Sequence, residues 1–315
     1  MKGVILAGDL GTFDHRFKGI IPKPLLLVHD KPMIFYPLHM LISSGIKEIL
    51  IISHPHEMLY YESLLGDGRR WGVSLKYIGT PFPDGISRAL FIGANFIGSD
   101  DVCVTLADRI FYGNSIKSFF AQKAEEAKNG KATILSSSED NISKIETILL
   151  NNNEEQNIGI EEDSEIFEDK LFSGLFFFPK NVIEKLKDFK ILTFGHLPIT
   201  SILKDYKKND MLEIKSQDTV FKTLKTNSYE EITSSAQFLL DLKRFSGISV
   251  ACMDEYAKKE RLKPNLVADN LQFNMNTKDQ LQDSQQKQKL NLKLRIDSSK
   301  NKNYEKNDEI SIIRY

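Results

Sequence analysis

The chain has 315 residues, of which 41% are hydrophobic, and its formal net charge is -1. This length suits one large α/β domain, or one domain with appendages. The balanced charge excludes a general attraction to nucleic acid or to a membrane surface. No apolar run approaches the roughly 20 residues that cross a bilayer, and the first residues predict a strand rather than a secretory signal. The only cysteines, Cys103 and Cys252, lie in apolar surroundings without metal-type spacing, so we expect a cytoplasmic protein with reduced thiols.

The first 135 residues alternate strand-like and helix-like runs. Continuous apolar runs predict buried strands at Gly3–Ala7, Glu48–Ser53, Leu75–Thr80 and Asp101–Asp108. Apolar residues at helical spacing predict helices at Ile34–Ser44 and Asp84–Phe96. This alternation is typical of a parallel sheet that helices cover on both faces, and ligands of such sheets collect at the carboxyl ends of the strands. Candidate site residues are therefore expected after Ala7, Thr80 and Leu106.

The pattern is looser after residue 136. The Asn-rich run Asn151–Asn153 predicts the turn of a hairpin that starts near Glu146. Further along, a strand is expected at "FSGLFFFP", a helix at Asn181–Phe189 and an amphipathic helix at Tyr229–Phe245. From residue 264 the chain is rich in Gln, Asn and Lys, which predicts a largely disordered tail. Within it, "KLNLKLRI" alternates apolar and polar residues at period two. The alternative to disorder for this segment is an edge strand or a partner-binding segment.

The first loop, "LAGDLGT", follows a buried strand. Glycines in such a loop let backbone N–H groups approach phosphate oxygens, and a helix N-terminus adds positive field. Neither the dinucleotide fingerprint nor the P-loop motif is present. The glycines alone therefore indicate a phosphate site only weakly, since turns use glycine anyway.

Several further motifs follow in order: "DKPMIFYPL", "LLGDGRRWG", "PDGISRALFIG", "LADRIFYG", "SGLFFFPKNVIEKLK" and "SGISVACMDEYAKK". With the first loop, they resemble the sugar-1-phosphate nucleotidyltransferase family, and within it the glucose-1-phosphate thymidylyltransferases. The similarity is nearly continuous from Met1 to Gly113 and weakens from Lys131 to Ser173. It implies a three-layer α/β nucleotidyltransferase domain, Rossmann-like, with a mixed, mainly parallel sheet.

The resemblance and the composition together divide the chain. We expect a nucleotidyltransferase-like domain at 1–263, with a nucleotide-binding half (1–113), a sugar-side half (114–232) and a C-terminal helical segment (233–263). The polar tail occupies 264–315. The implied reaction joins dTTP and glucose 1-phosphate, with Mg²⁺ assisting, and releases pyrophosphate and dTDP-glucose. The resemblance also implies an oligomer.

The family's site residues map onto this sequence by motif. The resemblance implies Lys23 and Asp108 as the candidate catalytic residues, with Asp108 also a ligand of Mg²⁺. It implies Ser173 and Gly174 for the sugar. The implied nucleotide contacts are Leu6, Ala7, Gly8, Gly11, Thr12, Lys23 and Gly85.

Several positions depart from the family pattern. Asp9 stands where the family has a glycine, and Phe13 where it has a phosphate-contacting arginine. Asp163 and Lys225 stand at the places of a sugar-phosphate lysine and of a second metal aspartate, while Thr80 replaces a base-reading glutamine. Arg109 follows Asp108, which leaves open whether that carboxylate binds a metal or forms an ion pair.

These departures remove cations from the phosphate sites and a carboxylate from the metal site. Arg16, Arg88 and Arg109 are alternative cations if their side chains point inward. We therefore expect a family member whose catalysis is weakened or lost. The alternative is a non-catalytic subunit that binds a nucleotide or sugar phosphate and regulates an active relative.

Overall fold

The computed structural model describes residues 1–8, 21–81, 85–150, 171–188, 199–219, 221–224, 226, 228–253 and 257–258. All of them lie in the unit Met1–Arg261. The second unit, Leu262–Tyr315, lies outside the described residues, and so do the predicted tail and its period-two segment.

Strands and helices alternate along this unit. The strands are β1 (Lys2–Leu6), β2 (Leu27–Val28), β3 (Lys31–Pro32), β4 (Glu48–Ser53), β5 (Ser74–Gly79), β6 (Val102–Leu106), β7 (Ile110–Tyr112), β8 (Ala132–Ser136), β9 (Phe172–Phe178), β10 (Leu212–Ser216) and β11 (Lys222–Leu224). The α-helices are α1 (Phe35–Ser43), α2 (Pro55–Leu65), α3 (Ile86–Ile92), α4 (Ala94–Ile97), α5 (Ile116–Lys128), α6 (Asp140–Leu150), α8 (Val182–Asp188), α9 (Ile199–Lys208) and α10 (Tyr229–Ser246). Single 3-10 turns occur at η2 (Lys23–Leu25), η3 (Arg69–Trp71) and η4 (Gln217–Thr219).

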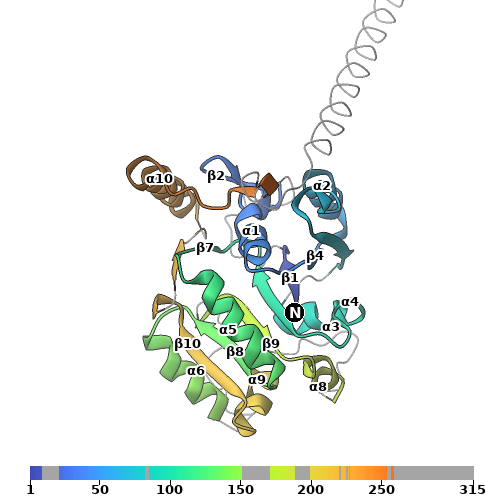
Figure 1. Cartoon of the computed structure of the whole chain (residues 1–315). Coiled ribbons are helices and arrows are strands. Elements are labelled where there is room, and N and C mark those ends of the chain that lie inside the picture. The colour runs from blue at the N-terminus through green and yellow to red at the C-terminus, as the bar shows by residue number, and fades with distance from the viewer. Residues whose placement is uncertain are drawn as a thin grey trace, which may run out of the picture. The chain divides into compact units, whose positions relative to one another are not determined.

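The described residues form a seven-stranded central sheet in the order β10-β8-β9-β6-β1-β4-β5 (Figure 1). Its neighbouring strands run parallel except for β9, which is antiparallel to both β6 and β8. The mixed, mainly parallel α/β sheet predicted from the sequence is therefore confirmed. Because β9 runs against its neighbours, its first residues lie at the carboxyl ends of β6 and β8.

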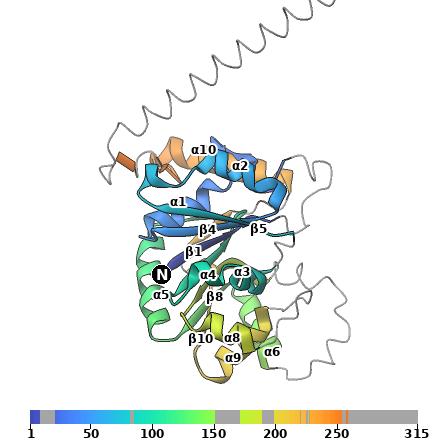
Figure 2. The same ribbon diagram turned by 90° about the vertical axis from the view of Figure 1, so that its right-hand side faces the viewer.

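Helices cover both faces of this sheet, and successive residues of β1 point alternately to the two faces. Val4 and Leu6 pack with α3, α4, α6, α8 and α9 in one apolar cluster. Ile5 and Ala7 point the opposite way and pack with α1, α2 and α5 in a second cluster. Figure 2 shows α1 and α2 on one side of β1, β4 and β5, with α3 and α4 on the other. The unbroken apolar strand is thus explained by burial on both faces.

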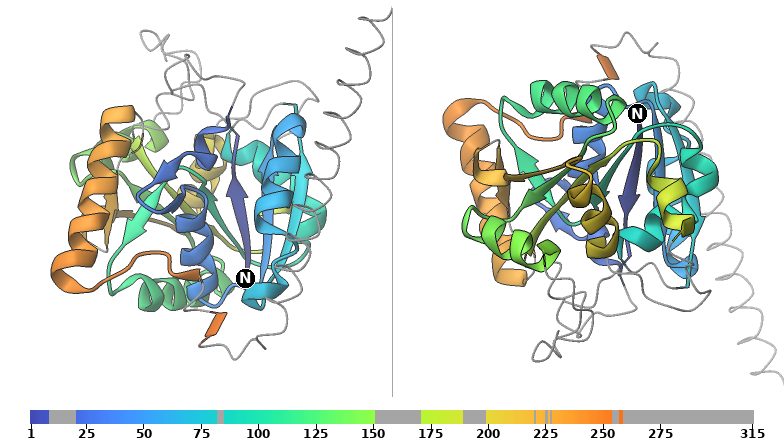
Figure 3. Two further views of the ribbon diagram at one scale, coloured as in Figure 1. Left: turned by 90° about the horizontal axis from the view of Figure 1, so that it is seen from above. Right: turned by 90° about the horizontal axis from the view of Figure 1, so that it is seen from below.

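Two small sheets and α10 complete the described part. β7 pairs antiparallel with β11, and β2 pairs antiparallel with β3. Helix α10 starts at an N-cap, Ser228, whose hydroxyl accepts from the amide of Glu231, and ends at Gly247 with φ +70°. In Figure 3 this orange helix and the light blue α2 lie at opposite ends of the domain. None of the described helices is long and apolar enough to span a bilayer.

Two predictions from the sequence are wrong in detail. The expected hairpin arm at Glu146–Leu150 is instead the end of helix α6, whose residues Ile145 and Leu149 are buried one helical turn apart. The Asn-rich turn itself lies outside the described residues. The helix expected at Asp84–Phe96 is divided at Gly93 into α3 and α4. The two cysteines are free, as predicted, but only Cys103 is fully buried.

Candidate functional site

The carboxyl ends of β1 and β6 lie side by side in the middle of the sheet. The amide of Ala7 donates to the carbonyl of Ile52 (2.7 Å), and the amide of Ala107 donates to the carbonyl of Leu6 (2.9 Å). These bonds extend the strand pairing by one residue on each side. Asp108 therefore leaves the sheet next to the loop that starts at Ala7 and Gly8, where ligands of parallel sheets bind.

Lys23 and Asp108 are 85 residues apart in sequence and meet at this point. Lys23 lies in η2, and its Nζ donates to Oδ2 of Asp108 at 2.6 Å. Arg109 Nε lies 3.4 Å from the other carboxylate oxygen, Oδ1. The three side chains are 5%, 14% and 10% exposed, for Lys23, Asp108 and Arg109 respectively. The sequence left two roles open for Asp108, a metal ligand or the partner of Arg109 in an ion pair. The structure contains this ion pair.

Buried charges of opposite sign hold this carboxylate in its ionised form. Burial raises the pKa of Asp108, but the charges of Arg109 and Lys23 and the hydrogen bond from Lys23 outweigh it and lower that pKa to about 2. With two cations around one anion, the three side chains together have a formal charge of +1. A net positive charge at the end of a strand suits an anionic ligand such as a phosphate.

The sugar-side residues predicted from the sequence adjoin the same cluster. Gly174 lies in β9 with φ +83°, and a Cβ on it would come within 3.0 Å of both Arg109 Cγ and Leu106 Cδ1. Glycine is required here because any side chain would meet Arg109 in a backbone conformation that L residues rarely adopt. The neighbouring Ser173 is buried, and its hydroxyl has no hydrogen-bond partner among the described residues. We name the group Ala7, Lys23, Asp108, Arg109 and Gly174 the strand-end site.

Other predicted residues lie around this site or outside the described residues. Gly85 has φ +74° and precedes α3 as its N-cap. Thr80 is buried, and its amide donates to the carbonyl of Ser53 at 2.9 Å. The residues that lie outside the described part of the chain are Asp9, Gly11, Thr12, Phe13, Arg16, Asp163 and Lys225.

Two residues that the sequence analysis did not identify donate hydrogen bonds to backbone carbonyls of the site. Tyr61, fully buried on α2, donates its hydroxyl to the carbonyl of Ala7 at 3.2 Å. Thr226 donates its hydroxyl to the carbonyl of Asp108 at 2.6 Å and continues the β7–β11 pairing toward the site. This contact brings Thr226 itself to the backbone of Asp108. Neither hydrogen bond has a signal in the local sequence, because each joins residues at least 54 positions apart.

The donor set of the described residues does not fit a Mg²⁺ ion held by the protein alone. Mg²⁺ takes octahedral oxygen ligands at about 2.0–2.1 Å, and in the described part of the chain no three His, Cys, Asp or Glu side chains gather into a metal site. Both oxygens of Asp108 face cations. A divalent ion about 4 Å from one such cation is repelled by roughly 8 kcal/mol at an effective dielectric of about 20.

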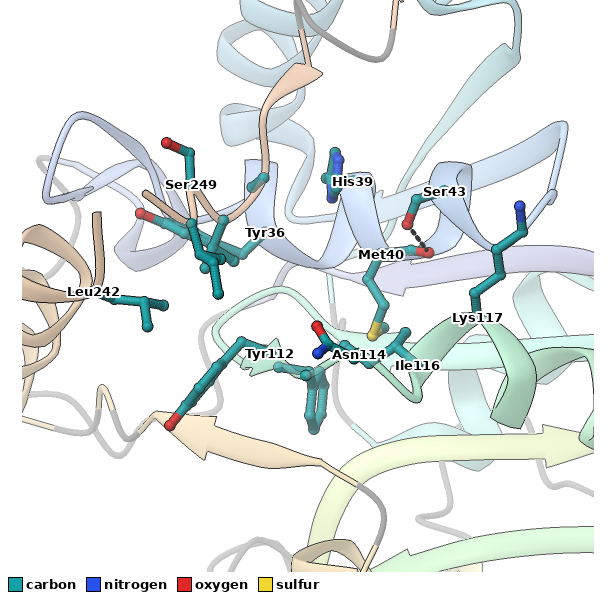
Figure 4. A pocket seen from close by; sticks show the side chains of 15 residues that line it. Tyr36, His39, Met40, Ser43, Tyr112, Asn114, Ile116, Lys117, Leu242 and Ser249 are labelled. Carbon is teal, nitrogen blue, oxygen red and sulfur yellow. Dashed lines mark hydrogen bonds between the residues drawn. The ribbon is translucent and has the colours of Figure 1, made fainter. Parts of the chain in front are cut away.

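A separate pocket of about 400 Å³ lies beside Phe111 and Tyr112 of β7 (Figure 4). Tyr36, His39 and Met40 of α1 form one wall, while Tyr112 of β7 and Lys117 of α5 form another. Leu242 of α10 and the segment Ile248–Ala251 close it. Its volume and aromatic lining are within the range of small-molecule sites.

Comparisons with known proteins show the family and the fold. The model of the nucleotidyl transferase family matches residues 2–224. A glucose-1-phosphate thymidylyltransferase of Neisseria meningitidis serogroup A is 34% identical over 258 residues, which are 82% of this chain and 88% of that protein. One of Neisseria gonorrhoeae is 33% identical over 257 residues, with the same coverage of 82% and 88%. Among solved structures, a Bacillus anthracis protein assigned as a glucose-1-phosphate thymidylyltransferase, in complex with sucrose, superposes with a TM-score of 0.60 at 26% identity. That match covers 76% of this chain and 94% of the other.

Proposed function

Since this chain belongs to the nucleotidyl transferase family, we propose that it binds a nucleoside triphosphate and a sugar 1-phosphate at the strand-end site. Nucleotidyl transfer between the two is weakened or lost in this protein. The contact of Lys23 with Asp108 at 2.6 Å, beside Ala7, is the observation on which the proposal rests. A buried cation at the carboxyl end of β1 and β6 supports the binding of an anionic phosphate there.

Nucleotidyl transfer needs little covalent chemistry from the protein. It needs aligned reactants and positive charge against the phosphates as charge develops in the transition state. Lys23 and Arg109 supply two cations, and Gly85, with φ +74°, is the N-cap of α3. By resemblance, the losses lie at Phe13, Asp163 and Lys225, which are the expected phosphate, sugar-phosphate and metal contacts. Binding is therefore better supported than efficient transfer.

The nucleotide and sugar of the curated relatives suggest the first substrates to test. The two Neisseria relatives are named glucose-1-phosphate thymidylyltransferases, so dTTP and glucose 1-phosphate are the starting pair. Calorimetry should detect dTTP binding to the full chain. A pyrophosphate-release assay with dTTP, glucose 1-phosphate and Mg²⁺ should give turnover well below about 1 per second, the lower end of usual enzyme rates.

Two substitutions connect the binding to the site. Lys23→Met should weaken dTTP binding at least about tenfold, because a charge-assisted contact to phosphate is lost. Lys128→Met removes the same charge from a side chain that is 64% exposed on α5 and serves as the control. Turnover above about 1 per second would contradict the weakened reaction, and equal dTTP affinity in the two variants would contradict the site.

A second candidate function is regulation of an active relative by a non-catalytic subunit. The observation that favours it is the engagement of Asp108 by Lys23 and Arg109, which places two cations around the expected metal ligand. This subunit should change the turnover or the substrate affinity of an active glucose-1-phosphate thymidylyltransferase when the two are mixed. An unchanged rate across a range of ratios would exclude the role for that relative.

A further inference from the structure

The two cations of the strand-end site approach different oxygens of the same carboxylate. Lys23 Nζ lies 2.6 Å from Oδ2 of Asp108, and Arg109 Nε lies 3.4 Å from Oδ1. The carboxylate thus lies between two positive groups that would otherwise repel each other. Each of the three side chains is at most 14% exposed, so water screens their charges weakly.

The backbone is built around the arginine. Gly174 lacks the Cβ that would come within 3.0 Å of Arg109 Cγ, and its φ of +83° is one that L residues rarely adopt. The hydroxyl of Thr226 holds the carbonyl of Asp108 at 2.6 Å, immediately before the arginine. Arg109 is therefore held in place by its surroundings rather than by its charge alone.

From this geometry we propose that Asp108 anchors Lys23 and Arg109 as a fixed pair of cations, which takes the place of a divalent metal ion in binding phosphate. The inference rests on the proposed function, because it names how that site holds a phosphate. Guanidinium groups match the geometry of phosphate oxygens and stay charged at any physiological pH. Phosphate binding at this site then requires no divalent ion.

The role of Asp108 can be tested with Mn²⁺ alone, without any nucleotide. We expect the wild-type chain to bind Mn²⁺ through Asp108 no more tightly than about 1 mM, the range of weak, ligand-poor cation sites. Arg109→Gln removes the charge beside Oδ1 and should tighten Mn²⁺ binding at least about tenfold, since it removes a repulsion of the ion. Arg109→Lys keeps the charge and should behave as the wild type does. Arg69→Gln is the matched control, because Arg69 is 81% exposed and lies in η3.

These titrations decide the inference by themselves. Mn²⁺ binding to the wild type that is tighter than about 1 mM, and that Asp108→Asn abolishes, would overturn it. So would a folded Arg109→Gln variant with unchanged Mn²⁺ affinity. Mn²⁺ binding that survives Asp108→Asn lies elsewhere and agrees with the inference. If Arg109→Gln fails to fold, the Mn²⁺ affinities of the wild type and of Asp108→Asn still decide the inference.

Titration with dTTP, once in EDTA and once in Mg²⁺, then separates this inference from the proposed function. The wild-type affinity should differ by less than about threefold between the two buffers, whereas Arg109→Gln should lose at least about tenfold in EDTA. A wild-type affinity that falls more than about tenfold in EDTA would overturn the inference. If dTTP binds in neither buffer, the proposed function fails, and the Mn²⁺ titrations still report on Asp108.

Discussion

The side chain of Arg109 passes over Gly174 so closely that a Cβ on the glycine would lie 3.0 Å from Arg109 Cγ. Arg109 follows β6, whereas Gly174 belongs to the antiparallel strand β9, so the contact joins residues from opposite strand directions. The residues expected at the sugar and those expected at the phosphate are therefore parts of one packed unit. A change at the glycine should reach the ion pair through this contact.

We predict that Gly174→Ala destabilises the fold by about 1–3 kcal/mol, the usual cost of a side chain in a strained backbone conformation. Leu106 Cδ1 lies as close to the added Cβ as Arg109 Cγ does, so the side chain of Leu106 must also move. Urea denaturation of both proteins measures the difference. A loss below about 0.5 kcal/mol, the range of ordinary surface substitutions, would contradict the close packing.

A double-mutant cycle isolates the part of this cost that belongs to Arg109. Combined with Arg109→Ala, which removes Cγ, the Gly174→Ala change should cost at least about 0.5 kcal/mol less than it does alone. The strain of the backbone and the contact with Leu106 remain in the double variant. Additive losses would mean that the two side chains are not in contact in solution.

Tyr61 positions the first loop, and its hydroxyl should matter although it touches no ligand. Tyr61→Phe removes the donor for the carbonyl of the buried Ala7 and should cost about 1–2 kcal/mol of unfolding free energy. The same change should weaken dTTP binding a few-fold, because the loop starts at that carbonyl. Tyr60→Phe removes a hydroxyl from the next residue, which is 55% exposed, and should change neither quantity. Equal effects of the two substitutions would argue against a positioning role.

The strands could be predicted because burial on both faces leaves a direct mark, an unbroken apolar run. β1, β4, β6 and β9 are such strands, and each lies within two residues of its predicted position. β5 was also predicted to within one residue, although it is an edge strand in which Ser74 and Lys76 are exposed. The end of α6 resembles a strand in sequence because the short apolar run Ile148–Leu150, before an Asn-rich run, fits either period. Only the packing of Ile145 and Leu149 against the sheet distinguishes the two.

The site was only partly predictable, because several of its contacts depend on tertiary packing that the local sequence does not show. The motifs placed Lys23 and Asp108 among the site residues, and the strand-end rule explains why residues after β1 and β6 meet. The role of Arg109 could not be derived, because an arginine next to an aspartate can turn toward it or away. The contribution of Tyr61 and Thr226 depends on hydrogen bonds between distant segments, which local sequence does not encode.

A buried lysine joins helix α5 to the edge of the sheet. Lys123 is fully buried, and its Nζ donates to Glu126 at 2.6 Å and also to Glu213 of β10. Burial raises the pKa of Glu213, but the hydrogen bonds and the charge of Lys123 outweigh it and lower that pKa to about 2. Removing the lysine leaves two carboxylates close together without their common cation.

We predict that Lys123→Met lowers the free energy of unfolding by about 3–5 kcal/mol, the usual effect of breaking a buried ion pair by removing one partner. Adding Glu213→Gln should recover part of the loss, because it removes one of the two carboxylates that have lost their common cation. Lys128→Met, on the same helix, should leave the urea midpoint unchanged, since its side chain is 64% exposed. A loss below about 1 kcal/mol for Lys123→Met would show that water reaches the carboxylates.

His39 should make the stability of the protein depend on pH above the range in which carboxylates titrate. Burial, and secondarily the charge of Lys31, lower the pKa of His39 to about 4, from an ordinary value of 6.5. Between these two values the unfolded chain binds a proton that the folded protein does not bind. The free energy of unfolding should therefore fall as the pH is lowered from 6.5 toward 4, and His39 should contribute nothing above that window.

By the linkage relation, acidification from pH 7.5 to pH 5 should remove about 1–2 kcal/mol of stability through His39. His39→Gln should flatten the curve of stability against pH in this window, because glutamine does not titrate. Ser43→Ala changes a neutral residue that also lines the pocket and should keep the wild-type slope. An NMR titration of the imidazole gives the direct measurement, with an expected midpoint near pH 4. A midpoint near the ordinary value would mean that the pocket wall opens to water and that the charged imidazole is solvated there.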